Sequence, residues 1–195
     1  MKWNTKFSYP KSTRSLINGS RHYSLDGSNL PSVTTILSAT KSEEDKAAIL
    51  AWKQRVGSVE AERIKKEASA RGSSMHSYIE QFLYGKLNQE LLEDNNKSKK
   101  MAEEIIDNGL KNKLLEIWGS EATIYYPGKY AGTADCIGVY EGKESILDFK
   151  QSNKPKKEEY IEDYFLQIGA YSLAHNTVYN SNITQGVILL CTVDR

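Results

Sequence analysis

Two apolar, strand-like runs at residues 132–140 and 145–151 constrain the fold of this chain more than any other feature. Each run carries an aspartate, Asp135 in the first and Asp148 in the second. The polar turn at residues 141–144 contains a glycine and separates them. Two β-rich runs around a short glycine-containing turn predict an antiparallel hairpin. The hairpin would bring the two carboxylates side by side.

The second run separates its side chains by face, because side chains alternate along a strand. Asp148 and Lys150 therefore point to one face. Leu147 and Phe149 point into the core, and the partner strand places Asp135 beside the polar face. Two carboxylates and an amine on one sheet face form a site for a hard divalent cation, which suits phosphodiester hydrolysis.

The acid-x-Lys triplet alone is a weak signal, since it occurs three times in the chain. An ion pair between Asp148 and Lys150 on a solvated strand is the alternative interpretation. Aspartate is disfavoured in strands, so the Gly-Thr-Ala-Asp run that ends at Asp135 and the hairpin context favour a site.

A helix is predicted upstream over residues 71–84, with Ser73 or Ser74 capping its start. Its apolar stripe consists of Met75, Ile79, Phe82 and Leu83. His76 and Glu80 lie four residues apart and are neighbours on one helix face. Such a pair is usually a solvated surface feature, but a neutral imidazole can also complete the ligand shell of Mn²⁺ or a similar ion.

A second helix is predicted downstream within residues 158–176. At helical periodicity one stripe contains Tyr160, Tyr164, Gln167 and Tyr171, and an adjoining stripe that should pack on the sheet contains Ile161, Phe165 and Ile168. A glutamine among tyrosines needs a hydrogen-bond partner when it is buried. Gln167 is therefore a candidate to orient Lys150, an attacking water or a phosphate oxygen.

Together these motifs resemble the RecB-type branch of the PD-(D/E)xK nuclease superfamily. The matching segments, in chain order, are Arg71-Gly72 with His76 and Glu80, Gly132-Thr133-Ala134-Asp135, Asp148-Phe149-Lys150, and Gln167 with Tyr171. Within that branch the chain is similar to the mitochondrial genome maintenance exonuclease family and its phage relatives. The resemblance extends over roughly residues 20–195.

The resemblance implies a mixed α/β fold with a restriction-endonuclease-like αβββαβ core. Residues 1–70 would form an N-terminal arm and helical subregion, and residues 71–195 the nuclease core, within one compact domain. The implied activity is that of a DNA exonuclease dependent on Mg²⁺ or Mn²⁺. It would act on free ends of single-stranded DNA in phage or bacterial replication, repair or recombination. A structure-specific endonuclease with the same core, and an inactive nucleic-acid-binding module, are the alternatives.

The resemblance also implies roles for individual residues. The expected metal ligands are Asp135, Asp148, the Phe149 carbonyl and His76, with Glu80 as a weaker partner of His76. Lys150 would position the water or stabilise charge on the phosphate, and Gln167 and Tyr171 would orient it. Contacts with nucleic acid are expected at Trp52, Arg71, Lys154, Lys156 and Tyr164.

Composition limits the class of protein. The 195 residues predict one domain, and the 39% hydrophobic content supports a real core. We expect no membrane span and no secretory signal, and hence a cytoplasmic location in a bacterial or phage-infected cell. Cys136 and Cys191 are expected as buried thiols and not as zinc ligands. The net charge of +1 is low for a nucleic-acid-binding protein, so basic residues would have to gather locally.

Periodicity and turn residues predict the remaining elements. Helices are expected at residues 32–37, 42–56 and 58–70, with a break near Gly57. A long amphipathic helix is expected to include Met101, Ile105, Leu110, Leu114 and Trp118 and to end at Gly119. The expected strands are residues 121–127, 132–140, 145–151 and 184–193, the last as a fully buried parallel strand. Residues 23–30 read as a short hairpin or arm, and residues 86–100 as a polar connection.

Overall fold

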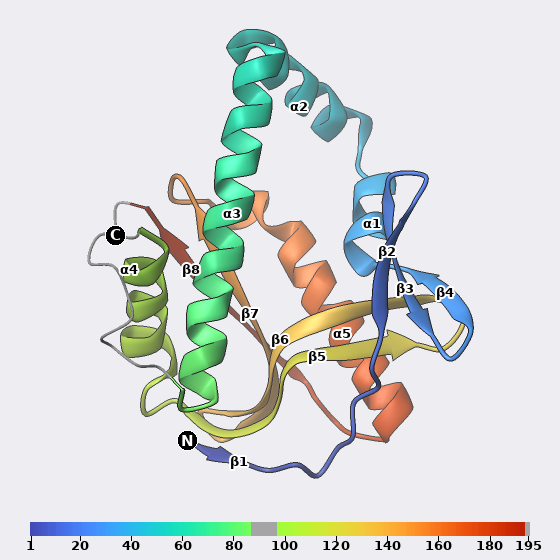
Figure 1. Cartoon of the computed structure of the whole chain (residues 1–195), viewed down its shortest axis with the longest axis vertical. Coiled ribbons are helices and arrows are strands. Elements are labelled where there is room, and N and C mark those ends of the chain that lie inside the picture. Colours follow the sequence, from blue (N-terminus) through green and yellow to red (C-terminus); the bar gives the residue numbers. More distant parts are fainter. Residues whose placement is uncertain (87–96, 194–195) are drawn as a thin grey trace.

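The computed structural model describes residues 1–86 and 97–193. The elements, in chain order, are β1 (Lys2–Trp3), β2 (Thr13–Ile17), β3 (Ser20–Leu25), β4 (Ser28–Pro31), α1 (Val33–Ala39), α2 (Glu43–Val56), α3 (Ser58–Leu83), α4 (Lys97–Glu104), the π-helical turn η2 (Ile105–Leu110), β5 (Leu114–Tyr126), β6 (Tyr130–Tyr140), β7 (Lys143–Ser152), the 3₁₀ turn η3 (Glu158–Tyr160), α5 (Glu162–Tyr179) and β8 (Gln185–Thr192). The fold is mixed α/β, as predicted (Figure 1).

A five-stranded sheet with the order β1-β5-β6-β7-β8 forms the centre of the molecule. Strands β5, β6 and β7 run antiparallel in a meander, and β8 returns parallel to β7. The predicted hairpin is confirmed: Tyr140 pairs with Lys143 around a turn in which both Glu141 and Gly142 have positive φ. The expected core order of helix, three strands, helix and strand is also confirmed, in α3, β5, β6, β7, α5 and β8, with α4 and η2 between α3 and β5.

Helices lie on both faces of the sheet (Figure 1), and an apolar cluster is buried on each face. On one face, α3 and α4 pack against residues that include Ile117, Leu147 and Phe149. On the other face, Tyr171 of α5 packs in a second cluster with Ile146. The predicted alternation in β7 is therefore confirmed. Both cysteines are buried, as expected.

The α3 helix is longer than the sequence predicts. It runs for 26 residues without a break, so Ser73 and Ser74 lie inside the helix and the prediction that one of them caps its start is wrong. The interruption at Gly57, with a φ of 87°, is confirmed. The division of the chain at residue 70 stays a prediction, and α3 crosses it as one continuous helix.

Helix α2 and the first half of α3 stand clear of the sheet (Figure 1). The Ser42 hydroxyl caps α2 by accepting a hydrogen bond from the Asp45 N–H, and none of the α2 residues is buried. Because α2 adds nothing to the core, its stability rests on local capping and on its junction with α3. Together, α1, α2 and this half of α3 form an arch-shaped connection, which we call the helical arch.

The long helix expected up to Trp118 is wrong. The helical segment ends at Leu110, Asn112 adopts a left-handed φ of 63°, and the chain enters β5 at Leu114. Residues four apart share a face both in a helix and in a strand, so the pair Leu114 and Trp118 fits either period. Pairing of β5 with both β1 and β6 decides in favour of the strand.

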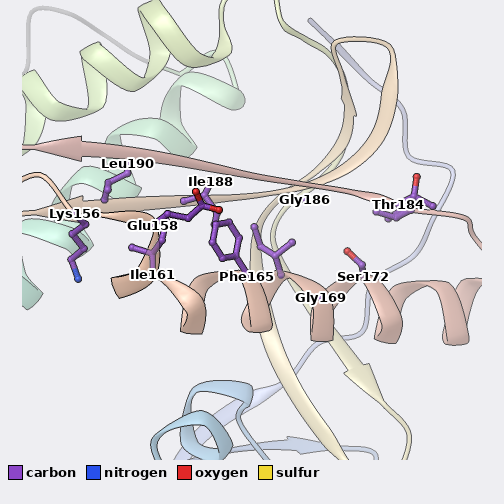
Figure 2. Close-up of a pocket in the computed structure, with 12 residues that line it drawn as sticks. Lys156, Glu158, Ile161, Phe165, Gly169, Ser172, Thr184, Gly186, Ile188 and Leu190 are labelled. Atoms are coloured by element: carbon purple, nitrogen blue, oxygen red, sulfur yellow. The ribbon is translucent and has the colours of Figure 1, made fainter. Parts of the chain in front are cut away.

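Strand β8 is parallel to β7, as predicted. It forms an edge of the sheet and is half-buried, so the expectation that it is buried is wrong. A cavity of about 650 Å³ lies between β8 and α5 and is lined by residues such as Ile188 and Phe165 (Figure 2). Phe165 is 47% exposed. Phe165 therefore borders this cavity and is not, as was predicted, buried against the sheet.

The N-terminal residues form a small three-stranded sheet, β2-β3-β4. Its hairpin between β3 and β4 confirms the one expected at residues 23–30. Tyr23, Leu25 and Leu30 pack on Ala131 at the start of β6, which places this sheet next to the aspartate hairpin. Most of the polar connection expected at residues 86–100 lies outside the described residues. Among the described helices, none combines the length and the apolar character that a bilayer span requires.

Candidate active site

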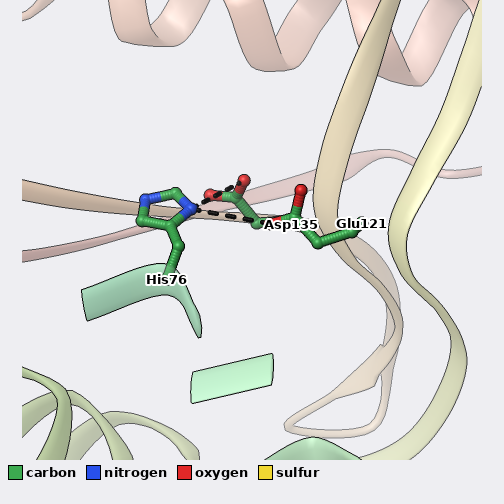
Figure 3. A group of neighbouring side chains, drawn as sticks. All are labelled: His76, Glu121 and Asp135. Carbon is green, nitrogen blue, oxygen red and sulfur yellow. Dashed lines mark ion pairs between the residues drawn. The ribbon is translucent and has the colours of Figure 1, made fainter. Parts of the chain in front are cut away.

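Three side chains from different elements converge beside the hairpin. His76 of α3, Glu121 of β5 and Asp135 of β6 each offer a ligand atom, and these atoms lie within 4.8 Å of one another. Nδ1 of His76 is 3.4 Å from Oδ1 of Asp135 and 3.6 Å from Oε1 of Glu121 (Figure 3). We call these residues the acidic cluster.

The orientation of His76 is fixed by its other ring nitrogen. Nε2 lies 2.8 Å from the carbonyl oxygen of Phe149 and donates to it. This bond leaves Nδ1 facing the two carboxylates. Burial lowers the pKa of His76, but hydrogen bonds with Asp135 and Glu121 outweigh that effect and raise it to about 10. Without a bound cation, a proton on Nδ1 therefore balances part of the acidic charge.

Asp135 lies where β6 and β7 separate. The paired register of these strands ends at Cys136 and Leu147. Beyond that pair, β6 continues beside β5 and β7 beside β8. The Phe149 N–H donates to Oδ2 of Asp135 at 2.6 Å. A carboxylate thus replaces the backbone acceptor at the point of separation, and the acids of both strands occupy the space that opens.

A chain of polar contacts leads from Asp148 to α5. Nζ of Lys150 lies 2.6 Å from Oδ2 of Asp148 and donates to Oε1 of Gln167 at 3.1 Å. The Gln167 amide in turn donates to the Tyr171 hydroxyl at 3.0 Å. Asp148 is only 3% exposed, and burial together with the charge of Asp135 raises its pKa to about 6. The contacts place Lys150 where Gln167 can orient it.

Gly132, the first residue of the Gly-Thr-Ala-Asp run, makes room for this chain of contacts. A β-carbon at Gly132 would lie 2.4 Å from Cε1 of Tyr171 and 2.7 Å from its hydroxyl. Contacts this short are not tolerated, so Tyr171 can occupy its position only against a glycine. The glycine therefore supports the position of Gln167 through Tyr171.

Glu121 was not predicted from the sequence. Its φ of 49° is left-handed although it lies inside β5. Its neighbours Ser120 and Ala122 pair with Cys136 and Ala134. A non-glycine residue in this conformation costs about 1–2 kcal/mol, and such strain often occurs at functional sites. The available signal was an acid at the first position of the strand predicted at residues 121–127.

The remaining predicted metal-site atoms lie around the cluster. Glu80 borders a cavity of about 360 Å³ together with His76 and Glu121, and burial and the charge of Glu121 raise its pKa. Asp148 is not one of the three converging ligands, although it is close enough to Asp135 for their charges to interact. The Phe149 carbonyl accepts the His76 hydrogen bond. Ligand roles for these three groups stay predictions.

The predicted nucleic-acid contacts are only partly brought together. Tyr164 lies between two amines, with Nζ of Lys150 at 5.1 Å and Nζ of Lys156 at 5.3 Å from its ring centre. Lys154 is exposed in the segment after β7. Arg71 donates to Gln151 and Asn153 and so fastens α3 to the end of β7. Trp52 lies on α2.

The donor set of the acidic cluster fits a divalent cation. Carboxylate oxygens suit Mg²⁺ and Mn²⁺, while an imidazole nitrogen favours Mn²⁺ over Mg²⁺. His76, Glu121 and Asp135 supply two carboxylates and one such nitrogen, and the Phe149 carbonyl holds the ring in a ligating orientation. The raised pKa of His76 shows that positive charge is favoured at this position.

In a comparison with curated proteins, the chain is similar to proteins named exonucleases. It is 30% identical over 180 residues to human mitochondrial genome maintenance exonuclease 1 and 29% identical over 178 residues to the protein of that name from Xenopus tropicalis. Each alignment covers 85% of this chain, but 50% of the human and 49% of the frog protein.

The mouse protein of that name is 27% identical over 183 residues, which make up 87% of this chain and 52% of the relative. The chain thus spans about half the length of the curated relatives it matches. No protein-family model matches it. The similarity favours a nuclease.

Proposed function

We propose that this chain is a metal-dependent nuclease that hydrolyses phosphodiester bonds in DNA. The observation that carries the proposal is the convergence of His76, Glu121 and Asp135 next to the pair of Asp148 and Lys150. Similarity to proteins named exonucleases supports it. A partly buried acidic cluster with an adjacent amine has the charge arrangement that phosphoryl transfer requires.

The residues divide the work as follows. His76, Glu121 and Asp135 would hold Mg²⁺ or Mn²⁺. The Asp148 carboxylate would lie close enough to interact with the positive charge of that ion. The bound cation supplies Lewis acidity toward the phosphate and lowers the pKa of a water. Lys150, aligned by Asp148 and Gln167, donates hydrogen bonds to the phosphate oxygens where negative charge develops.

Within this proposal we assign the activity to free ends of single-stranded DNA. In the helical arch, α2 and the first half of α3 stand clear of the sheet (Figure 1). His76 lies in the second half of α3, whose residues Met75 and Ile79 pack on the sheet. A flexible single strand with an end can pass under such an arch, whereas a closed circle cannot be threaded. Exposed bases can stack on aromatic side chains such as Tyr164.

The test is digestion of labelled linear and circular single-stranded DNA with Mn²⁺ or Mg²⁺, in parallel with EDTA. Loss of only the linear strand is expected, because only an end can be threaded. Cleavage of the circle would favour the endonuclease alternative. Retained binding without cleavage would favour the inactive module.

Asp148→Asn provides the variant for this assay, and Asp107→Asn the matched control. Asp107 is an exposed carboxylate paired with Lys111 on the surface. We expect Asp148→Asn to lose cleavage and Asp107→Asn to keep it. Full activity of the Asp148 variant would contradict the proposed site.

A further inference from the structure

A second cation, Arg14 of β2, reaches the acidic cluster from the small N-terminal sheet. One guanidinium nitrogen lies 4.0 Å from Oε2 of Glu121 and donates to the Thr133 hydroxyl at 3.3 Å. The Tyr23 hydroxyl lies 3.0 Å from the same Thr133 oxygen. Thr133 precedes Asp135 by two residues on β6, so Arg14 is held close to the proposed reaction site.

Most of the hydrogen-bonding capacity of Arg14 is free. A guanidinium carries five N–H donors. The described contacts of Arg14 are one hydrogen bond to a neutral hydroxyl, an ion pair at the limit of contact and a cation–π contact with the Tyr23 ring, which occupies none of these donors. Its side chain is 54% exposed. By contrast, Lys150 is bound to Asp148 and Gln167, and Arg71 to Gln151 and Asn153. Arg14 is therefore better able than Lys150 or Arg71 to bind an anionic ligand.

Arg14 also stands between two cavities. The cavity of about 360 Å³ that contains His76 and Glu80 is bordered by Arg14 and Glu121. A second cavity, of about 580 Å³, shares these two residues and extends along β5. Its wall includes the basic side chain of Lys11, the hydroxyl of Ser12 and the aromatic rings of Trp3 and Tyr84. A chain molecule crossing from one cavity to the other must pass the guanidinium.

We propose that Arg14 binds a phosphate of a nucleic-acid strand that lies across these two cavities. The inference rests on the proposed nuclease function and names a contact with its substrate. The guanidinium fork matches a phosphate in geometry and charge. The aromatic groups Trp3 and Tyr84, whose rings stack at 4.8 Å, border the cavity where the adjacent nucleotides would lie.

The experiment measures binding and cleavage separately. Arg14→Gln removes the charge, and Arg14→Lys keeps the charge but not the fork. Arg21→Gln is the matched control, because Arg21 is an exposed arginine on β3 of the same sheet and outside both cavity walls. Binding of a fluorescent single-stranded DNA is measured in EDTA over a series of salt concentrations, and kcat and KM are measured with Mn²⁺. Thermal melting verifies that each variant is folded.

We expect Arg14→Gln to weaken binding about tenfold, the loss of one charge-assisted contact. The slope of log affinity against log salt should become shallower by about 0.7, the value for one phosphate of a single strand. A residue that only fastened the small sheet would lower stability without changing that slope. Arg14→Lys should restore the salt slope but only part of the affinity, and Arg21→Gln should behave as the unmodified protein.

The outcomes separate the two proposals. If the unmodified protein cleaves DNA and Arg14→Gln keeps its affinity, salt slope and KM, the Arg14 assignment is overturned and the nuclease assignment stands. If the unmodified protein neither binds nor cleaves DNA, the proposed function is overturned and the Arg14 assignment falls with it. Weaker binding and a shallower slope in a folded Arg14→Gln protein that still cleaves would support both.

Discussion

Gly132 lies directly against the ring of Tyr171, so that a β-carbon at this glycine would approach Cε1 to 2.4 Å. Gly132→Ala should therefore push the tyrosine away, and with it the amide of Gln167 that contacts Lys150. Overpacking of this kind costs about 1–3 kcal/mol. We expect lower stability in urea unfolding and a marked drop in kcat.

Gly169→Ala is the matched control for this substitution. Gly169 lies on α5 near Tyr171, and a β-carbon there would have no neighbour within 4 Å. Alanine is the better helix former by about 1 kcal/mol, so this variant should be slightly more stable and fully active. Equal behaviour of the two alanine variants would contradict the role assigned to Gly132.

Glu121 combines a ligand position with an unfavourable backbone conformation. Glu121→Gln should weaken Mn²⁺ binding, measured by isothermal titration calorimetry, because one carboxylate is lost. Glu121→Gly should weaken it similarly and be more stable than the glutamine variant by about 1 kcal/mol, since glycine adopts a positive φ without strain. Glu62→Gln, at an exposed position on α3, is the control. Unchanged Mn²⁺ affinity in both Glu121 variants would remove Glu121 from the site.

Cation binding should raise the melting temperature. A ligand that binds only the folded state stabilises it by about 2.7 kcal/mol at a concentration one hundred times its Kd. We expect Mn²⁺ to raise the melting temperature of the unmodified protein and EDTA to reverse the shift. Asp135→Asn should abolish the response, since the amide keeps the acceptor for the Phe149 N–H but loses the charge. A full shift in this variant would contradict the role of Asp135.

His175 should make stability depend on pH. It is fully buried between Tyr9 and Ser181, and burial together with the charge of Lys6 lowers its pKa to about 4. The folded state therefore binds this proton less readily than the unfolded chain, whose histidine titrates near 6.5. The stabilisation is complete above about pH 6.5 and is lost as the pH falls toward 4.

Urea unfolding of the unmodified protein and of His175→Gln, at about pH 7.5 and about pH 5, measures this effect. The loss attributable to His175 at about pH 5 should be about 2 kcal/mol. Asp148, whose pKa is raised, has the opposite sign in this range, but it is present in both proteins and cancels in the difference. Identical pH dependence in the two proteins would rule out this role of His175.

The parts of the site that could be predicted are those encoded in local pattern. The alternation around Asp148, the turn at residues 141–144 and the spacing of Gln167 and Tyr171 indicated a hairpin, its polar face and a helix beside it. The structure confirms the hairpin and brings Lys150 and Gln167 into contact.

The features that were missed depend on tertiary structure. Glu121 itself has a left-handed φ inside a strand, and it reaches the cluster in this conformation. The periodicity of the sequence does not reveal such a conformation. Leu114 and Trp118 fit the helical and the strand period equally, and only pairing of β5 with its neighbours resolves them. Gly72 was read as lying near a helix start, yet it lies within α3 where Gln151 packs against it.

The separation of β6 and β7 has a consequence for the choice of inactive variants. Where these strands separate, the Asp135 carboxylate accepts a hydrogen bond from the Phe149 N–H, in place of a backbone acceptor on a paired strand. An alanine at this position would remove both the proposed metal ligand and the acceptor of this hydrogen bond. A loss of activity in that variant would combine two effects, the missing ligand and the weakened contact between β6 and β7. Asparagine keeps an acceptor for the Phe149 N–H. Asp135→Asn is therefore the substitution with which a complex with the substrate can be trapped while the contact between β6 and β7 is retained.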